Sequence, residues 1–196
     1  AKTFSISARI FDLVPANISA KIFALSQFAR VKVPLSGHAE MELPRDGGLT
    51  RASFEFAAAA GQVGLPEYVA QPIIIDEGSL HADYDPANGG VIIRNSSLLV
   101  GGSRAELTGG FVPVRGADGR LLSIDIQLSA RSASIDTQGT VVSPVMIDRV
   151  EFKGNTGIAT AELNIEDFVI MSGDAGVRMR GKITGGERSP GLILSG

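Results

Sequence analysis

The sequence predicts an all-β protein built from antiparallel strands, with one short amphipathic helix near the N-terminus. Three observations lead to this fold class. Apolar and polar residues alternate along most of the chain, one segment shows helical spacing instead, and the 24 glycines lie mostly between the alternating runs. Alternation with a period of two is typical of strands that bury one face, and glycine between such runs is typical of turns.

The helix is expected over residues 15–30. Its apolar residues Ile18, Ile22, Leu25 and Ala29 are spaced by four, three and four positions, which places them on one side of a helix. Pro15 suits the first helical turn, where the missing N–H costs nothing. The rest of the chain is expected to form about 12 to 16 strands, given a mean strand length of about 5 to 6 residues.

The strongest turn signals are two Asp-Gly pairs that each join two alternating runs. Asp46-Gly47 and Asp118-Gly119 both predict hairpin turns of type I′, which need a positive φ at both central residues. A longer connection of the same kind is expected over residues 83–90. Dense hairpin turns of this sort indicate that neighbouring strands run antiparallel.

A shift of 72 residues brings many of these features into register without a gap. The glycines that coincide form two sets: Gly37, Gly109 and Gly181, and Gly47, Gly119 and Gly191. The parity of the apolar positions is also kept, which favours an array of β units over two separate domains. The predicted division is a strand and helix over 1–33, units at about 34–105 and 106–177, and the start of a third over 178–196.

Each strand is apolar on one side only, so the sheet has a single face that must be covered. A short helix is too small for this, which leaves a two-sheet sandwich, a closed barrel or solenoid, or a sheet bent into a trough filled by something else. Small residues such as Ala39, Ala82 and Gly109 on the apolar side leave room for a ligand, although small residues also mark tight bends. The parity predicts that this inner face is lined by Phe54, Phe56, Leu80, Val91, Ile93, Leu107, Phe111, Ile124, Ile126, Leu128, Leu163, Ile165 and Met179.

Composition argues against several classes of function. With 18 Lys and Arg against 21 Asp and Glu, the net charge is −3, and no basic footprint for nucleic acid is present. The chain has no Cys, and its two histidines, His38 and His81, fall on the polar parity without metal-ligand spacing. No nucleophile elbow, phosphate-binding loop or catalytic carboxylate pair is found, so we expect neither an enzyme nor a cofactor. No apolar run approaches the roughly 20 residues that cross a bilayer.

The order of features resembles the AsmA-like family of Gram-negative envelope proteins over nearly the whole chain. The resemblance rests on the amphipathic segment 15–30, the strand opening at residues 33–37, the turn and strand over 46–56, the run 78–85, and the strand-closing residues 107–109. It implies an elongated, bent antiparallel sheet that forms a taco-like groove, along which phospholipid acyl chains pass between the inner and outer membranes. It also implies a periplasmic parent that is anchored in the inner membrane and is much longer, so this chain is expected to be an internal segment.

Binding in such a groove is expected to involve acyl chains without recognition of a headgroup. The basic side chains that could hold a phosphate lie on the opposite parity: Arg51, Arg94, Arg104, Arg178 and Arg180. The alternative is a structural or adhesive β-repeat domain of a secreted or cell-surface protein, with a dry, fully packed core. A parallel β-helix would have a shorter period of about 20 to 30 residues, so the 72-residue period fits several antiparallel strands per unit.

Overall fold

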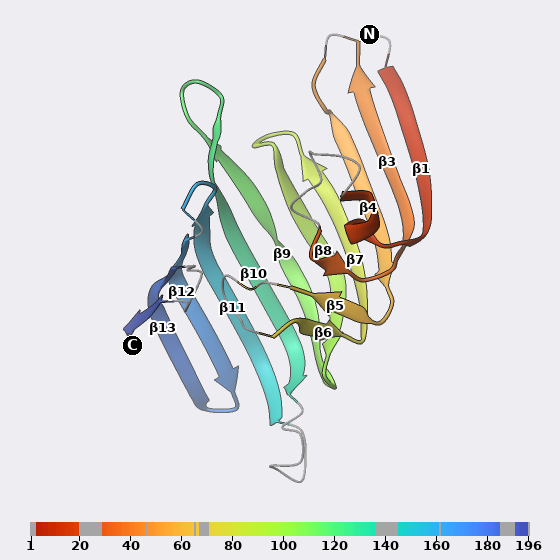
Figure 1. The fold of residues 1–196 in the computed structure, drawn as a ribbon. Helices are drawn as coiled ribbons and strands as arrows, with labels where there is room; N and C mark the ends of the chain where they lie inside the picture. The colour runs from red at the N-terminus through yellow and green to blue at the C-terminus, as the bar shows by residue number, and fades with distance from the viewer. Residues whose placement is uncertain are drawn as a thin grey trace.

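The computed structural model describes residues 3–19, 29–45, 47–64, 66, 71–135, 145–160, 162–184 and 191–195, and these form fourteen strands and one helix (Figure 1). The all-β class predicted from the alternation is therefore confirmed. The elements in chain order are β1 (Thr3–Leu13), α1 (Pro15–Ser19), β2 (Val31–Lys32), β3 (Leu35–Pro44), β4 (Arg51–Ala58), β5 (Gly61–Val63), β6 (Ile73–Ile75), β7 (Glu77–Asp85), β8 (Gly90–Val100), β9 (Ser103–Arg115), β10 (Leu121–Ile135), β11 (Val145–Gly157), β12 (Glu162–Ser172), β13 (Ala175–Thr184) and β14 (Gly191–Ser195).

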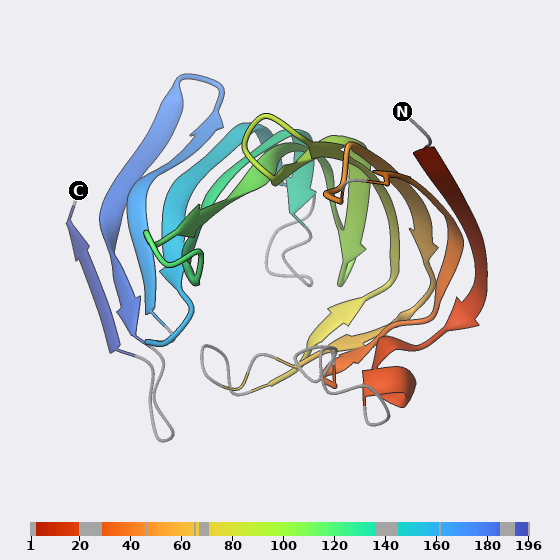
Figure 2. The same ribbon diagram turned by 90° about the horizontal axis from the view of Figure 1, so that it is seen from above.

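Eleven of the strands form one large antiparallel sheet. Its order is β1-β3-β4-β7-β8-β9-β10-β11-β12-β13-β14, so each strand pairs with the sheet strand before and after it in the chain. Seen from above, the strands follow one another around an arc that is open on one side, with the two termini at its ends (Figure 2). The sheet is therefore bent into a trough, as the groove-like architecture requires.

The other three strands, β2, β5 and β6, form a small separate sheet that the alternation did not predict. It lies with α1 at the open side of the arc (Figure 2). Val33, which follows β2, and Ile75 of β6 are among the most buried apolar residues described, so this corner is tightly packed. The small sheet therefore covers part of the trough near its N-terminal half.

The curvature of the large sheet has two local causes. The first is a set of irregularities in pairing, at which a strand gains extra residues and bends. Three of these contain a residue with positive φ that is not glycine, namely Asp12 in β1, Asn95 in β8 and Ser132 in β10. The second cause is close approach of strands at glycine. A Cβ atom at Gly109 would lie only 2.1 Å from the carbonyl oxygen of Gln127 on β10.

The strand pattern repeats at a shift of 72 residues. Moved by this amount, β8 coincides with β12, the end of β7 with the end of β11, and the start of β9 with the start of β13. Pairing repeats as well, because Lys32↔Gln62 in the small sheet matches Arg104↔Ser134 between β9 and β10. Gly61↔Ile75 likewise matches Ala133↔Ile147 between β10 and β11. The small sheet is therefore the counterpart of strand ends that, one unit later, stay joined to the large sheet.

Two local expectations need correction. The described part of the predicted helix spans only Pro15–Ser19, residues 20–28 lie outside the described residues, and Ala29 and Arg30 form a turn instead of helix. The turn at Asp118-Gly119 is also not a two-residue type I′ turn, because Gly119 has a positive φ and Asp118 does not. Five residues, 116–120, connect the paired ends of β9 and β10, and the Asp118 carboxylate instead accepts the backbone N–H of Arg120 at 3.1 Å.

Candidate functional site

One face of the large sheet is apolar across its whole width. Residues that pair directly in an antiparallel sheet point to the same side, so the register can be followed from strand to strand. Starting at β1, one such row contains Ala8, Ala39, Phe54, Ala82, Ile93, Gly109, Leu128, Phe152, Phe168 and Met179. Next to it, Val91, Phe111, Ile126, Gly154, Ile165 and Gly181 form a second row.

These rows place all thirteen residues of the predicted lining on this one face. Phe54, Ile93, Leu128 and Met179 belong to the first row, and Val91, Phe111, Ile126 and Ile165 to the second. The remaining five stand two positions along a strand from a row member, and so point to the same side: Phe56, Leu80, Leu107, Ile124 and Leu163. A role of these residues in lipid binding stays a prediction, whereas their common side follows from the pairing.

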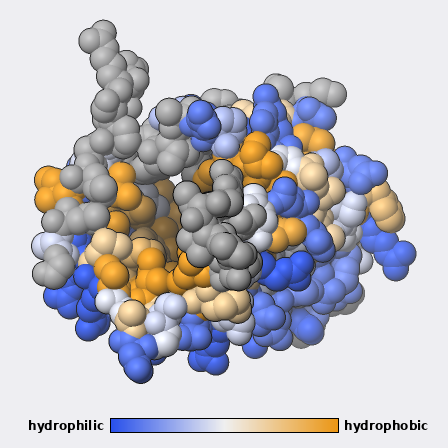
Figure 3. All heavy atoms as spheres, turned by 90° about the horizontal axis from the view of Figure 1, so that it is seen from below, coloured by the Kyte–Doolittle hydropathy of each residue, from blue (hydrophilic) through white to orange (hydrophobic). Residues whose placement is uncertain are grey.

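The apolar face contains a hollow toward the end of the sheet at which β4 and β10 end. Its volume is about 260 Å³. Seen from below, hydrophobic residues gather around the hollow of the arc, while the outer side is mostly hydrophilic (Figure 3). The hollow is lined by Leu98, Val100, Ser103, Arg104, Ala105, Ala130, Ala133, Ser134, Ile135, Ile147 and Val150.

Sequence reasoning named none of these hollow-lining residues as groove residues. In β8 the apolar positions are odd-numbered at Val91 and Ile93 and even-numbered at Leu98 and Val100, because the extra residue at Asn95 shifts the alternation. The sequence does not mark this change of phase, because Leu98, Leu99 and Val100 are all apolar and no alternation resumes after the bulge.

The lining is built largely from small or half-buried side chains. Five of the ten buried apolar residues described are alanines, for example Ala39, Ala82 and Ala130. No large side chain among the described residues is completely buried. A packed core normally fills its interior at high density with large interdigitating side chains. The described side chains of the apolar face therefore form a partly exposed lining and do not make up a densely packed core of large side chains.

The charged side chains of the sheet pair with one another on the opposite face. Four of these ion pairs are short, and three of them join single atoms: Arg94 to Asp83 at 2.6 Å, Lys153 to Glu166 at 2.9 Å, and Lys182 to Glu162 at 2.7 Å. Arg178 binds Asp167 through two nitrogens, at 2.6 and 2.8 Å. This separation agrees with the expected parity of the basic residues. Arg104 is an exception in part, because it pairs with the outward residues of β8 and also borders the hollow.

The ion pairs shift the pKa values of their members. The hydrogen bond from Arg178 holds the pKa of Asp167 below its usual value, and the hydrogen bond from Lys153 does the same for Glu166. The pKa values of Lys153 and Arg178 are raised by the same hydrogen bonds. All four groups therefore stay charged at neutral pH and keep the outer face solvated.

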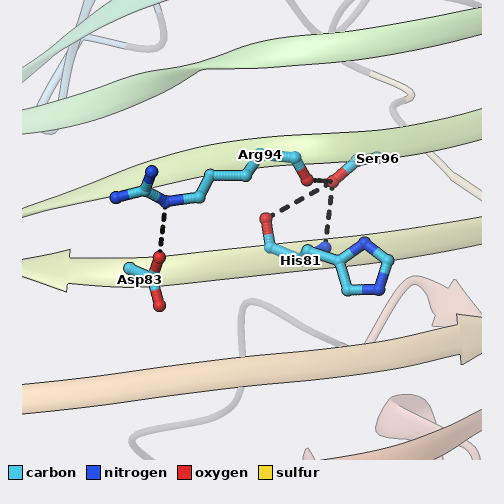
Figure 4. A network of polar contacts seen from close by, with 4 residues as sticks. All are labelled: His81, Asp83, Arg94 and Ser96. Atoms are coloured by element: carbon cyan, nitrogen blue, oxygen red, sulfur yellow. Dashed lines mark hydrogen bonds and ion pairs between the residues drawn. The ribbon is translucent and has the colours of Figure 1, made fainter.

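A polar side chain stands on the apolar face at Ser96, where β8 bulges (Figure 4). Ser96 is 3% exposed and pairs with Leu107, and its hydroxyl bonds to the backbone. It accepts the backbone N–H of His81 at 2.9 Å and donates to the carbonyl oxygen of Arg94 at 3.0 Å. The hydroxyl therefore replaces ladder hydrogen bonds that the bulge interrupts, and its hydrogen is already donated within the sheet.

The two histidines do not come together as a site. The His38 ring is 3.6 Å from the Glu55 carboxylate, and the His81 ring nitrogen Nδ1 is 3.1 Å from the carbonyl oxygen of Asn95. Within the described residues, no group of three or more His, Asp or Glu side chains could hold a metal ion. No helix among the described residues has the length and hydrophobicity to span a membrane.

No model of a protein family, no curated protein and no solved structure matches this chain.

Proposed function

We propose that this chain is a segment of a bridge-like lipid-transfer protein, whose apolar groove carries phospholipid acyl chains between the inner and outer membranes. The observation that carries the proposal is the continuous apolar face on the concave side of an open sheet, with a hollow of about 260 Å³ and with no completely buried large side chain among the described residues. A large apolar surface of this kind is unusual on a soluble monomer and marks a binding surface.

The chemistry of the lining favours acyl chains over ligands with polar groups. Each CH₂ group that leaves water contributes about 0.8 kcal/mol, so affinity grows with chain length. The ion-paired residues lie on the other face, and the buried hydroxyl of Ser96 is already hydrogen-bonded. Headgroups would therefore remain in water at the open side, and binding would depend little on their chemistry.

The periplasmic location and the bridging role come from the resemblance to the AsmA-like family. The repeated strand pattern supports such a role, because a sheet whose units recur every 72 residues is extended simply by adding units. Anchoring in the inner membrane would be supplied by parts of the parent protein that are not in this sequence. No enzymatic step, cofactor or nucleic acid enters the proposal.

The introduction of a single charge on the groove face tests this function. Ile126→Asp and Leu163→Asp each place a carboxylate on the apolar face. The matched controls are Gln127→Asp and Asn164→Asp, which introduce the same group one residue away on the outer face. Native mass spectrometry of co-purifying lipids and photocrosslinking to a lipid probe measure binding, and far-UV circular dichroism measures folding.

The expected result is that both groove variants fold and lose lipid, while both controls keep it. Folding is expected because an open groove admits water to the carboxylate, whereas an unpaired charge in a dry core costs several kcal/mol. Unfolding of both groove variants with folded controls would instead indicate a closed, packed core, which is the structural or adhesive β domain. Undiminished lipid binding by folded groove variants would also contradict the proposal.

A further inference from the structure

Two hairpin ends in this chain carry apolar residues at matching positions, and some of these residues are exposed in both. The end formed by β5 and β6 and the end formed by β10 and β11 are related by the 72-residue shift. Their matching residues are Val63 and Ile135, Ile73 and Val145, Ile74 and Met146, and Ile75 and Ile147. Both residues are buried only in the last pair, Ile75 and Ile147.

Of the other three positions, one is exposed in both units, and the other two are half-buried in the earlier unit and exposed in the later one. Ile74 is 51% exposed and its counterpart Met146 is 58% exposed, so the same position is apolar and exposed in both units. Ile135 is 43% exposed and Val145 38%. Burial within this chain does not account for the apolar residue that both units carry at the position of Ile74 and Met146.

Ile135, Val145 and Met146 stand at one end of the large sheet, and Ile74 belongs to β6 of the small sheet, which leads into β7 at the same end. β1, β4 and β10 run in the same direction in the antiparallel order, so their C-terminal ends lie at a common rim. Phe11, near the end of β1, belongs to this rim and is 78% exposed. We call this set the lower rim; it consists of Phe11, Ile74, Ile135, Val145 and Met146.

The lower rim is continuous with the hollow in the apolar face. Ile135 both lines the hollow and is exposed at the rim, and its neighbours Ala133 and Ile147 are buried in the lining. The view from below looks onto this end of the strands, and hydrophobic residues border the opening there (Figure 3). Ile135 and its pairing partner Val145 lie on the same side as this lining, whereas Ile74 and Met146 stand next to the buried Ile75 and Ile147 and point to the opposite face. An acyl chain that passes Ile135 and Val145 meets apolar side chains from the outside to the interior.

We propose that the lower rim inserts into the surface of a lipid bilayer and is the port through which acyl chains enter or leave the groove. This inference rests on the proposed function. A bilayer is the partner that fits, because it supplies the acyl chains for which the hollow has room, and because bulky apolar side chains on hairpin ends partition into its interface. A protein partner would not require the apolar path from the rim to the hollow.

The opposite end of the sheet provides a matched control. Leu122 and Ile158 are exposed there to a similar degree, at 56% and 51%, and the N–H of Ile158 bonds to the carbonyl oxygen of Leu122. Neither residue lines the hollow. If exposed apolar residues promoted vesicle binding in general, substitutions at both ends would weaken it equally. A port at the lower rim predicts that only substitutions at that end weaken it.

The experiment compares Ile74→Ser/Met146→Ser with Leu122→Ser/Ile158→Ser in the full chain; none of these four residues lines the hollow, and the two pairs are similarly exposed. Flotation with phosphatidylcholine vesicles, alone and with added phosphatidylglycerol, measures membrane binding, and titration with a fluorescent fatty acid below its micelle concentration measures groove binding. The affinity of the rim variant for vesicles should fall by a factor of about ten or more. Each lost apolar side chain removes burial in the membrane, and 1.4 kcal/mol corresponds to a tenfold change in affinity. Fatty-acid binding by the rim variant should be unchanged, and the control should match the wild type in both assays.

Equal vesicle binding by the rim variant and the wild type would overturn the port, and so would equal losses in the rim and control variants. Loss of fatty-acid binding in the rim variant would also contradict it, because the rim would then be part of the binding site itself. A wild-type chain that binds vesicles through the rim but takes up no fatty acid would refute the proposed function, and the rim would stand as a membrane contact alone.

Discussion

Substitution of Gly109 by alanine should destabilise the protein more than the same change at other glycines, because two separate costs meet at this residue. The first is conformational: Gly109 has a φ of 149°, a region that residues with a Cβ atom rarely adopt. The second is steric. The added Cβ would lie 2.1 Å from the carbonyl oxygen of Gln127 and 2.9 Å from the Cα of Leu128, both of them backbone atoms in the neighbouring strand.

The structure allows the two costs to be separated with two other glycines. Gly119 has a φ of 79° but no atom within 4 Å of its added Cβ, so Gly119→Ala carries only the conformational cost, about 1 to 2 kcal/mol. At Gly37 the Cβ would lie 1.9 Å from the carbonyl oxygen of Glu55, yet φ is not positive, so Gly37→Ala carries only the steric cost. The added Cβ would push the neighbouring strand away. This resembles overpacking of a core, which lowers the free energy of unfolding by about 1 to 3 kcal/mol.

We therefore expect Gly109→Ala to lower the free energy of unfolding by about 2 to 5 kcal/mol, which is the combined effect of both costs. Urea unfolding followed by far-UV circular dichroism measures it, with Gly119→Ala and Gly37→Ala as the two reference variants. The reasoning would be refuted if Gly109→Ala were no less stable than Gly119→Ala. It would also be refuted if Gly37→Ala were as stable as the wild type, because the close approach of the strands would then have no energetic weight.

The other stability predictions concern Ser96 and the outer ion pairs. Ser96→Ala should cost about 1 to 3 kcal/mol in urea unfolding, because it leaves the buried N–H of His81 without a partner, and Ser96→Thr should retain part of this. Hydrogen bonds hold the pKa values of Asp167 and Glu166 below their usual 3.8 and 4.5, so their stabilisation is complete above those values and is lost as the pH falls through the lowered ones. Asp167→Asn and Glu166→Gln should flatten the acid side of a plot of urea midpoint against pH, and high salt should reduce the difference.

The shared apolar face could be predicted because each strand is half-buried. Between two irregularities of pairing, side chains alternate strictly from one face to the other, so one apolar residue fixes the side of the rest. That is why Ile124, Ile126 and Leu128 on β10 could be placed together from the sequence. The common face could also be predicted from one strand to the next, because paired residues such as Leu128 and Phe152 point to the same side of the sheet.

The hollow could not be predicted in the same way, because strand irregularities leave no clear mark in the sequence. Turns are marked by glycine, but the residues with positive φ inside β1, β8 and β10 are Asp12, Asn95 and Ser132. Asp and Asn tolerate this conformation better than most residues, yet they are also common on the polar face of any strand. The small sheet was missed for a related reason. Strands of two or three residues, such as Val31–Lys32 and Gly61–Val63, are too short to show alternation.

The irregularities of pairing that the alternation does not reveal are also the features that shape the proposed groove. A regular sheet of eleven strands would present a broad apolar face to water, whereas a bulge bends its strand and increases the local twist. At Asn95 and Ser132 the bulged strands β8 and β10 also supply Leu98, Val100, Ala130 and Ala133 to the hollow. Gly37 and Gly109, at matching positions of two units, allow the neighbouring strand to approach more closely than a side chain would permit. Because the devices that bend the sheet stand beside the residues that line its hollow, the concave shape and the apolar lining arise from the same positions in each unit.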